Sequence, residues 1–193
     1  MQQYYELTAL LEKWTYLGRK ELTNGVILIG HVPHIAPEAW LHTIYPGLNK
    51  NQIETLEQNL LIKFTTDFRS FLSYNNGINI FADSLSIFGL RTSYERQGDK
   101  SRQPYDIISL NKERPKGCSK YFLHIGSYSW DGSKVYIDCE DEQNQKVYRC
   151  ERRGLTILQE WADICSWLVG ETTRLQLLFD DRGKKENPKM PTV

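Results

Sequence analysis

The stretch that decides the fold is LNKNQIETLEQNLLIKFTTDFRSFLSYNNG, residues 48–77. Its first half has the spacing of an amphipathic helix, in which apolar residues three and four positions apart share one buried face. That predicted face consists of Ile53, Leu56, Leu60 and Leu61. Asn49 can cap the helix because Gln52 stands at its third position, as in a capping box. Leu48 can then pack on Ile53 across the first turn.

The second half of the stretch predicts another helix after a short break. Thr65 or Thr66 can cap it. Its apolar side consists of Phe68, Phe71 and Leu72. Gly77 follows, and glycine is the residue type that most often ends a helix in the left-handed conformation. We therefore expect this helix to end at the Asn-Gly turn.

Upstream, the chain predicts one more helix and a short strand. Apolar residues recur at helical spacing near the start of the chain, at Leu7, Leu10, Leu11, Trp14 and Leu17. VILIG, residues 26–30, is a strand-like run. HVPHIAPEAW, residues 31–40, contains two prolines, which disfavour a regular element.

Downstream of Gly77 the apolar pattern changes from helical spacing to short runs of branched and aromatic residues. Gly, Asn, Asp and Pro separate these runs, which is typical of antiparallel strands joined by turns. The runs are INIF (78–81), LSIFGL (85–90), YDIISL (105–110), YFLHIG (121–126), KVYIDC (134–139) and KVYRC (146–150).

TILQEWADICSWLVG, residues 156–170, returns to helical spacing and predicts a closing helix. Thr156 and Gln159 have the spacing of a capping box, and Trp161 falls on the apolar stripe as a core residue. The order of elements predicts an α+β fold, in which N-terminal helices pack on a multistranded antiparallel sheet and a C-terminal amphipathic helix closes the domain.

Composition limits the classes of function. The 193 residues suit one domain, and 24 Lys plus Arg balance 24 Asp plus Glu, so no net charge favours nucleic acid or anionic lipid. The sequence has no apolar run of the roughly 18 residues that span a bilayer and no secretory leader, so a cytoplasmic protein is expected. Four cysteines without a C-x-x-C pair predict free thiols rather than a zinc site, and disfavour a Cys139–Cys150 disulfide.

Several motifs together resemble the SUKH superfamily of Smi/Knr-type proteins. Ile53 and Glu57 match an Ile-x-x-x-Glu pattern, Asp67-Phe68 an Asp-Tyr pair, and Asn76-Gly77 a following turn. IGSYSWDGSKVYID and LQEWADICSWL are similar to the family's later strand turn and closing helix. The chain departs from the pattern at Thr65, where the family usually has proline, and at Ile78, which replaces a second glycine. The resemblance implies a SUKH-like domain over residues 46–170, an N-terminal extension (1–45) with a helix and a short strand, and a polar tail (171–193) whose end is expected to be disordered.

What the resemblance implies is a binding protein. Bacterial members are mostly immunity proteins that neutralise polymorphic toxins, often nucleases, and the family has no established catalytic residues. The residues agree: no G-x-S-x-G elbow, P-loop or G-x-G-x-x-G motif is present. We expect the four histidines, His31, His34, His42 and His124, to be solvated or core side chains. The basic stretch with Lys112, Arg114, Lys116 and Lys120 is expected to be a solvated connection.

HIGSYSWDGSKVYIDCEDE, residues 124–142, contains the candidate contact residues. Strand alternation places Val135, Ile137 and Cys139 on one face and leaves the acids after them outside the core. The first interpretation is a hairpin loop kept soluble by charge, with a Trp that covers the sheet edge. The sharper hypothesis is a surface complementary to a basic toxin. That surface would contain Trp130, Asp131, Asp138, Glu140, Asp141 and Glu142.

The predicted function is therefore immunity, by direct binding of a cognate protein toxin. The alternative is a regulatory scaffold of the same fold with an endogenous protein partner. A hydrolase is a third possibility that no motif supports. No metal, cofactor, direct nucleic-acid contact or membrane contact is expected, and a small-molecule ligand is disfavoured.

Overall fold

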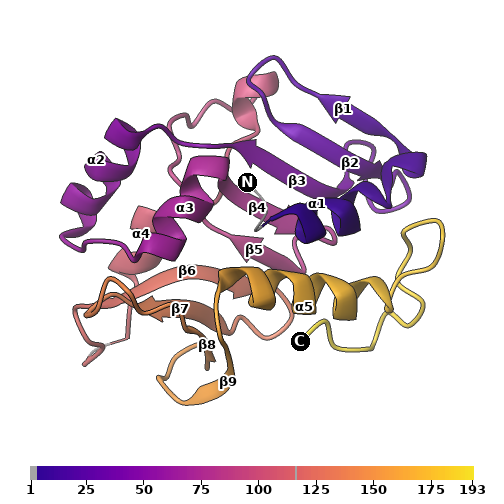
Figure 1. The fold of residues 1–193 in the computed structure, drawn as a ribbon. Helices are drawn as coiled ribbons and strands as arrows, with labels where there is room; N and C mark the ends of the chain where they lie inside the picture. Colours follow the sequence, from indigo (N-terminus) through magenta and orange to yellow (C-terminus); the bar gives the residue numbers. More distant parts are fainter. Residues whose placement is uncertain (1–3, 116) are drawn as a thin grey trace.

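A nine-stranded antiparallel sheet runs through the computed structural model, which describes residues 4–115 and 117–193 (Figure 1). Each strand pairs with its neighbours in the sequence, so the order in the sheet is the order in the chain. The strands are β1 (Arg19–Glu21), β2 (Ile27–His31), β3 (Trp40–Pro46), β4 (Asn75–Ile80), β5 (Leu85–Ile87), β6 (Phe122–Tyr128), β7 (Lys134–Asp138), β8 (Val147–Cys150) and β9 (Ile157–Trp161).

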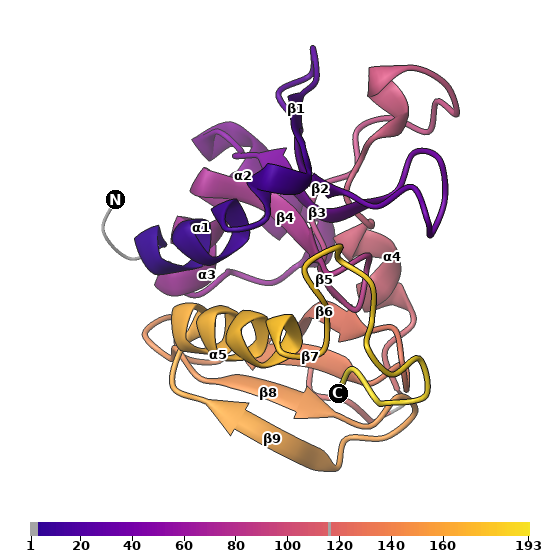
Figure 2. The same ribbon diagram turned by 90° about the vertical axis from the view of Figure 1, so that its right-hand side faces the viewer.

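Helices lie on both faces of this sheet. Figure 2 shows α1, α3 and α5 together on one side and α4 on the other. The α-helices are α1 (Tyr5–Glu12), α2 (Lys50–Leu60), α3 (Thr66–Tyr74), α4 (Ile107–Lys112) and α5 (Ile164–Gln176). Two 3-10 turns, η1 (Thr15–Leu17) and η2 (Asp99–Ser101), complete the described elements. The predicted α+β class is confirmed. None of the described helices has the length and apolar character that crossing a bilayer requires.

The core lies between the sheet and the three helices on its inner side. Alternate residues of the central strands face it, among them Val135 and Ile137 of β7. Aromatic side chains fill the space beneath the helices, where Phe68, Phe71 and Trp167 are fully buried. The predicted inner face of β7, with Cys139 at its end, is therefore confirmed.

The predicted starts of α2 and α3 are confirmed. Gln52 N–H donates to Asn49 Oδ1 over 3.0 Å, and Asn49 N–H donates to Gln52 Oε1 over 2.9 Å, which completes the capping box. At α3, Thr65 Oγ1 accepts from Phe68 N–H over 3.4 Å. Both caps satisfy donors that a helix start leaves without an intrahelical partner.

The sequence predicted that α3 ends at Gly77, and this prediction is wrong. The helix stops at Tyr74, and the chain passes directly into β4, which contains Gly77 with φ +90°. A Cβ atom at this position would lie 2.6 Å from the carbonyl oxygen of Ile87 on β5. Glycine is therefore required here by the close approach of two strands rather than by a helix end.

YDIISL forms helix α4 and not the predicted strand. Asp106 caps it, with Oδ1 accepting from Ile108 N–H at 3.1 Å and Oδ2 from Ser109 N–H at 3.3 Å. Ile107 and Leu110 are buried, so the apolar residues pack beneath a short helix. The cap and this packing outweigh the strand propensity of a run with two isoleucines.

The closing helix begins later than predicted. Residues Ile157–Trp161 form the edge strand β9, and the expected Thr156–Gln159 capping box is replaced by one between Asp163 and Ser166. Trp161 is therefore a partly buried strand residue, and Trp167 is the tryptophan of α5 that the core encloses. Residues Ile157–Trp161 pair with β8, so α5 can begin only after them. The spacing of apolar residues alone does not reveal this pairing.

The segments outside the SUKH-like region also join the fold. Residues 4–45 supply α1, β1, β2 and most of β3. After α5 the chain turns back, and Tyr16 Oη donates to the carbonyl of Asp181 over 2.8 Å. Arg174 donates to the carbonyl of Thr192 over 3.0 Å, and Thr192 is buried. These two contacts connect the segment after α5 to η1 and to α5 itself.

Candidate partner-binding surface

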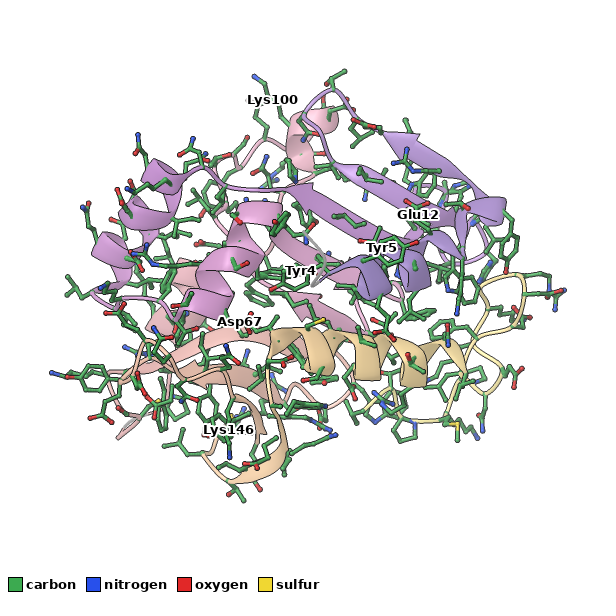
Figure 3. All side chains as sticks on the ribbon, in the orientation of Figure 1. Tyr4, Tyr5, Glu12, Asp67, Lys100 and Lys146 are labelled. Atoms are coloured by element: carbon green, nitrogen blue, oxygen red, sulfur yellow. The ribbon has the colours of Figure 1, made fainter. Side chains whose placement is uncertain are left out.

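Asp67 ties three parts of the chain together. Its carboxylate is 5% exposed. Oδ2 accepts from Ile164 N–H at the start of α5 over 3.1 Å, and Oδ1 accepts from Tyr4 Oη over 3.5 Å. Figure 3 shows Asp67 between α3 and α5 and Tyr4 beside them. Burial and the Asp67 carboxylate raise the pKa of Tyr4 well above its ordinary value, so the phenol remains a donor.

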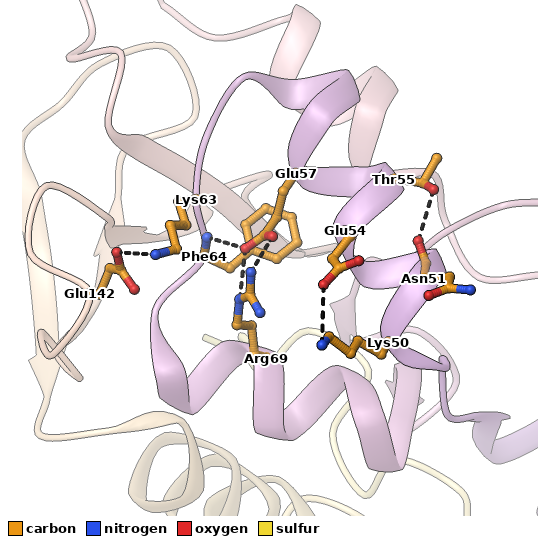
Figure 4. A network of polar contacts seen from close by, with 9 residues as sticks. All are labelled: Lys50, Asn51, Glu54, Thr55, Glu57, Lys63, Phe64, Arg69 and Glu142. Carbon is orange, nitrogen blue, oxygen red and sulfur yellow. Dashed lines mark hydrogen bonds and ion pairs between the residues drawn. The ribbon is translucent and has the colours of Figure 1, made fainter.

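Glu57 has a similar role at the end of α2. Its Oε1 accepts from Phe64 N–H at 2.7 Å and from Arg69 Nε at 2.8 Å, and its Oε2 pairs with Arg69 Nη2 (Figure 4). The Glu57 side chain is only 10% exposed. Its carboxylate therefore fixes both the connection after α2 and the first turns of α3.

Asn76 ties β4 to the segment after β5. Its Oδ1 accepts from Leu90 N–H at 2.6 Å, and its Nδ2 donates to the carbonyl of Leu90 at 2.8 Å. The amide side chain thus replaces a missing pair of backbone hydrogen bonds. Together with Gly77, Glu57 and Asp67, it shows that these motif residues hold the fold together.

The profile of the SMI1/KNR4 family (SUKH-1) matches residues 47–170. The chain belongs to the SMI1/KNR4 family. The matched part begins just before α2 and ends within α5, so it contains all the motif residues described above. The resemblance seen in the sequence is confirmed. No curated protein matches the sequence. The motif residues of this family member are therefore structural, and the predicted contact residues are a separate set.

The six predicted contact residues of this SMI1/KNR4 member do not lie together. Trp130 and Asp131 are in the β6–β7 turn, whereas Asp138 is the last residue of β7 and Glu140 to Glu142 follow it. β7 has five residues, and a strand of that length spans about 13–17 Å. The six residues therefore form two separate surfaces at opposite ends of β7, and not one surface as the hypothesis requires.

Asp138, Glu140, Asp141 and Glu142, here called the acidic loop, are held by short-range hydrogen bonds. Asp138 Oδ1 accepts from Glu140 N–H at 3.0 Å, and Asp141 Oδ1 accepts from Gln143 N–H at 2.9 Å. Glu140 and Asp141 are exposed, and neither forms an ion pair with any described residue. The loop thus presents carboxylates to solvent from a defined backbone.

Glu142 attaches the acidic loop to the connection between α2 and α3. Lys63 Nζ lies 2.6 Å from Glu142 Oε1 (Figure 4). Thr66 N–H donates to the carbonyl of Glu142 over 3.0 Å. A hollow of about 310 Å³ beside this contact is lined by Glu54, Glu57, Gln58, Leu61, Ile62 and Lys63. The acidic loop and this hollow therefore form a continuous surface, which is the candidate contact surface.

Leu61 is a member of this surface that the sequence did not reveal. Helical spacing predicted it on the buried face of α2, but it is the residue after the helix and its side chain is 91% exposed. Its φ of +54° lies in the left-handed region, which turns the side chain away from the core. In the sequence, the one signal of this exposure was a leucine directly after the helix, at a position where glycine is usual.

Asp131 is occupied within the molecule. Its Oδ2 pairs with Arg149 Nη2 at 2.7 Å, and its Oδ1 accepts from Ser133 N–H at 2.9 Å. Burial alone would raise the pKa of Asp131, but the hydrogen bonds from Ser133 and Arg149 outweigh it and lower that pKa. Its neighbour Trp130 is 47% exposed, and Lys185 Nζ lies 4.5 Å from the centroid of the Trp130 ring.

Two of the four histidines lie in the protein interior. His42 and His124 are buried, and burial lowers their pKa values to about 3 and about 4. None of the four cysteines forms a disulfide in the described chain. Within the described part of the chain, no group of three His, Cys, Asp or Glu side chains is arranged to hold a metal ion.

Proposed function

We propose that this SMI1/KNR4 family member is a bacterial immunity protein, which works in the cytoplasm by binding a cognate protein toxin and catalyses no reaction. The observation that carries the proposal is the acidic loop. It holds Glu140 and Asp141 exposed and without ion pairs to described residues, on a backbone fixed to the family fold through Glu142. The partner contacts this loop directly, and binding needs no cofactor.

The charge of the loop suits a nuclease toxin. A nuclease binds phosphates through Lys and Arg, so its working surface is basic. Carboxylates held in place on the inhibitor raise the rate of encounter and disfavour other partners. Leu61 supplies an apolar contact beside the charges, which is the usual composition of an interface centre with a polar rim.

The test begins with capture of partners from the native cells, followed by binding kinetics with the captured toxin domain. The double variant Glu140→Lys with Asp141→Lys should slow association about tenfold or more while the melting temperature stays the same. The control is Glu38→Lys with Glu151→Lys, which makes the same charge change at two other exposed positions. Equal association rates for the two double variants would remove the acidic loop from the proposal. Capture of a housekeeping protein, and no toxin, would favour a regulatory scaffold.

A further inference from the structure

A second hollow, of about 370 Å³, lies at the end of β7 away from the acidic loop. Four segments far apart in the sequence form it: the β2–β3 loop, the β4–β5 turn, the β6–β7 turn and the chain after α5. Its large apolar and its basic lining residues are Ile35, Phe81, Trp130, Phe179, Lys184 and Lys185. The volume falls within the range of about 300–1,000 Å³ that is usual for ligand pockets.

The wall of this hollow is apolar. Phe81 is fully buried and stacks on Phe179, with 4.7 Å between ring centroids. At the rim, Ile35 and Trp130 keep 52% and 47% of their surface exposed. Two large apolar side chains beside a packed aromatic wall form the kind of pocket that receives an anchor residue.

The charge of the hollow is positive. Lys184 and Lys185 line it, and none of its described lining residues is acidic. Lys185 Nζ lies 4.5 Å from the centroid of the Trp130 ring and donates to the carbonyl of Met190. Neither lysine forms an ion pair with a described residue. Lys184 is exposed, so its charge is available to an anion that approaches the rim, and the partly buried Lys185 adds a second positive charge beside Trp130.

The β4–β5 turn behind the hollow has a strained backbone. Phe81, Ala82 and Asp83 have φ values of +49°, +50° and +66°, which residues other than glycine rarely adopt. Ala82 N–H donates to the carbonyl of Leu41 over 2.8 Å, and Ser84 Oγ donates to that of Phe81 over 2.7 Å. Strain held in place in this way is more frequent at ligand sites than elsewhere.

We propose that this hollow docks an extended acidic segment of a partner protein. The segment inserts one apolar side chain between Ile35 and Trp130 and places carboxylates next to Lys184 and Lys185. Nucleic acid fits less well, since repeated phosphates need a longer basic groove than two lysines form. The site is separate from the acidic loop, so it does not depend on the immunity proposal.

Two short peptides test the proposal in solution with the full ¹⁵N-labelled chain. In the first peptide, one leucine is flanked by three acidic residues on each side; in the second, lysines replace all the acids. The acidic peptide should shift the indole N–H signal of Trp130, which the Trp130→Phe variant identifies, and the lysine peptide should not. No shift at millimolar acidic peptide, or equal shifts with both peptides, would overturn the proposal. So would a shift produced only by a single-stranded oligonucleotide.

Variants of the lining residues test the position of the site. Lys184→Glu should weaken binding of the acidic peptide about tenfold, since this exposed lysine lines the hollow and forms no ion pair in the described chain. Trp130→Ala should weaken it similarly through lost apolar contact. The control Lys13→Glu with Lys112→Glu changes two exposed lysines outside the hollow and should leave the affinity the same. Equal loss in this control would show general charge attraction and contradict a built site.

Discussion

Leu61 combines a left-handed backbone, with φ +54°, and a side chain that is 91% exposed. The conformation costs a residue with a Cβ atom about 1 kcal/mol relative to glycine. The exposure places apolar surface in water without any packing in return. Neither feature stabilises the folded chain, so Leu61 is a suitable position at which to test the proposed partner contact.

The variant Leu61→Gly separates the effect of this residue on stability from its effect on partner binding. We expect the free energy of unfolding to change by less than about 1 kcal/mol, because the relief of strain offsets the larger entropy of an unfolded glycine. Dissociation of the toxin domain should become about tenfold faster, since an apolar anchor mainly affects the off-rate. Urea unfolding and surface plasmon resonance measure the two effects. Unchanged dissociation would remove Leu61 from the interface.

His124 predicts a pH dependence of stability. Burial lowers its pKa from 6.5 to about 4, so the folded protein keeps the ring neutral while the unfolded chain takes up a proton below about pH 6.5. The stabilising contribution of the neutral ring is thus complete above that pH and declines as the pH falls. The expected loss is about 1.4 kcal/mol per pH unit, or about 2 kcal/mol at pH 5.

The variant His124→Phe tests this effect. Both ring nitrogens of His124 are buried without a hydrogen-bond partner in the described chain, so the change should cost little at pH 7. At pH 5 the variant should be more stable than the parent by about 2 kcal/mol. His34→Phe, at an exposed position, is the control. Parallel pH profiles for parent and His124→Phe would contradict a neutral buried ring.

At the scale of elements, α5 offers a direct comparison of two capping boxes. Asp163 Oδ1 accepts from Ser166 N–H at 2.6 Å, whereas Thr156 has no such role because it precedes β9. Asp163→Ala should lower the free energy of unfolding by about 1 kcal/mol, and Thr156→Ala by less than about 0.5 kcal/mol. Denaturant titration of both variants measures this. A larger loss in Thr156→Ala would mean that the helix starts seven residues earlier.

Local sequence predicted the elements whose caps and periodicity agree, α2 and α3 above all, because both signals come from adjacent residues. It did not predict β9, whose strand form depends on pairing with β8, nor the role of Gly77, which depends on the approach of β5. The acidic loop was found from its charge. Its distance from Trp130 follows from the length of β7 and could have been derived, whereas the exposure of Leu61 requires the path of the chain after α2.

At the scale of the whole molecule, the balanced net charge of zero conceals two surfaces of opposite sign. The acidic loop lies at one end of β7, and the hollow with Lys184 and Lys185 lies at the other. A partner therefore experiences a directional field even though the total charge vanishes. This separation allows a basic toxin and an acidic segment to bind the same molecule without competing for one surface.

The field predicts how toxin association depends on salt. Steering by exposed charges acts over the Debye length, which falls from about 14 Å at 50 mM to about 4 Å at 500 mM salt. Association should therefore slow about tenfold or more over this range, with a much smaller change in dissociation. In the double variant Glu140→Lys with Asp141→Lys, the association rate should depend only weakly on salt concentration. In Lys184→Glu the salt dependence should stay the same, because Lys184 lies at the far end of β7. Stopped-flow measurements at several salt concentrations decide this, and a slope that persists in the acidic-loop variant would place the steering charges elsewhere on the molecule.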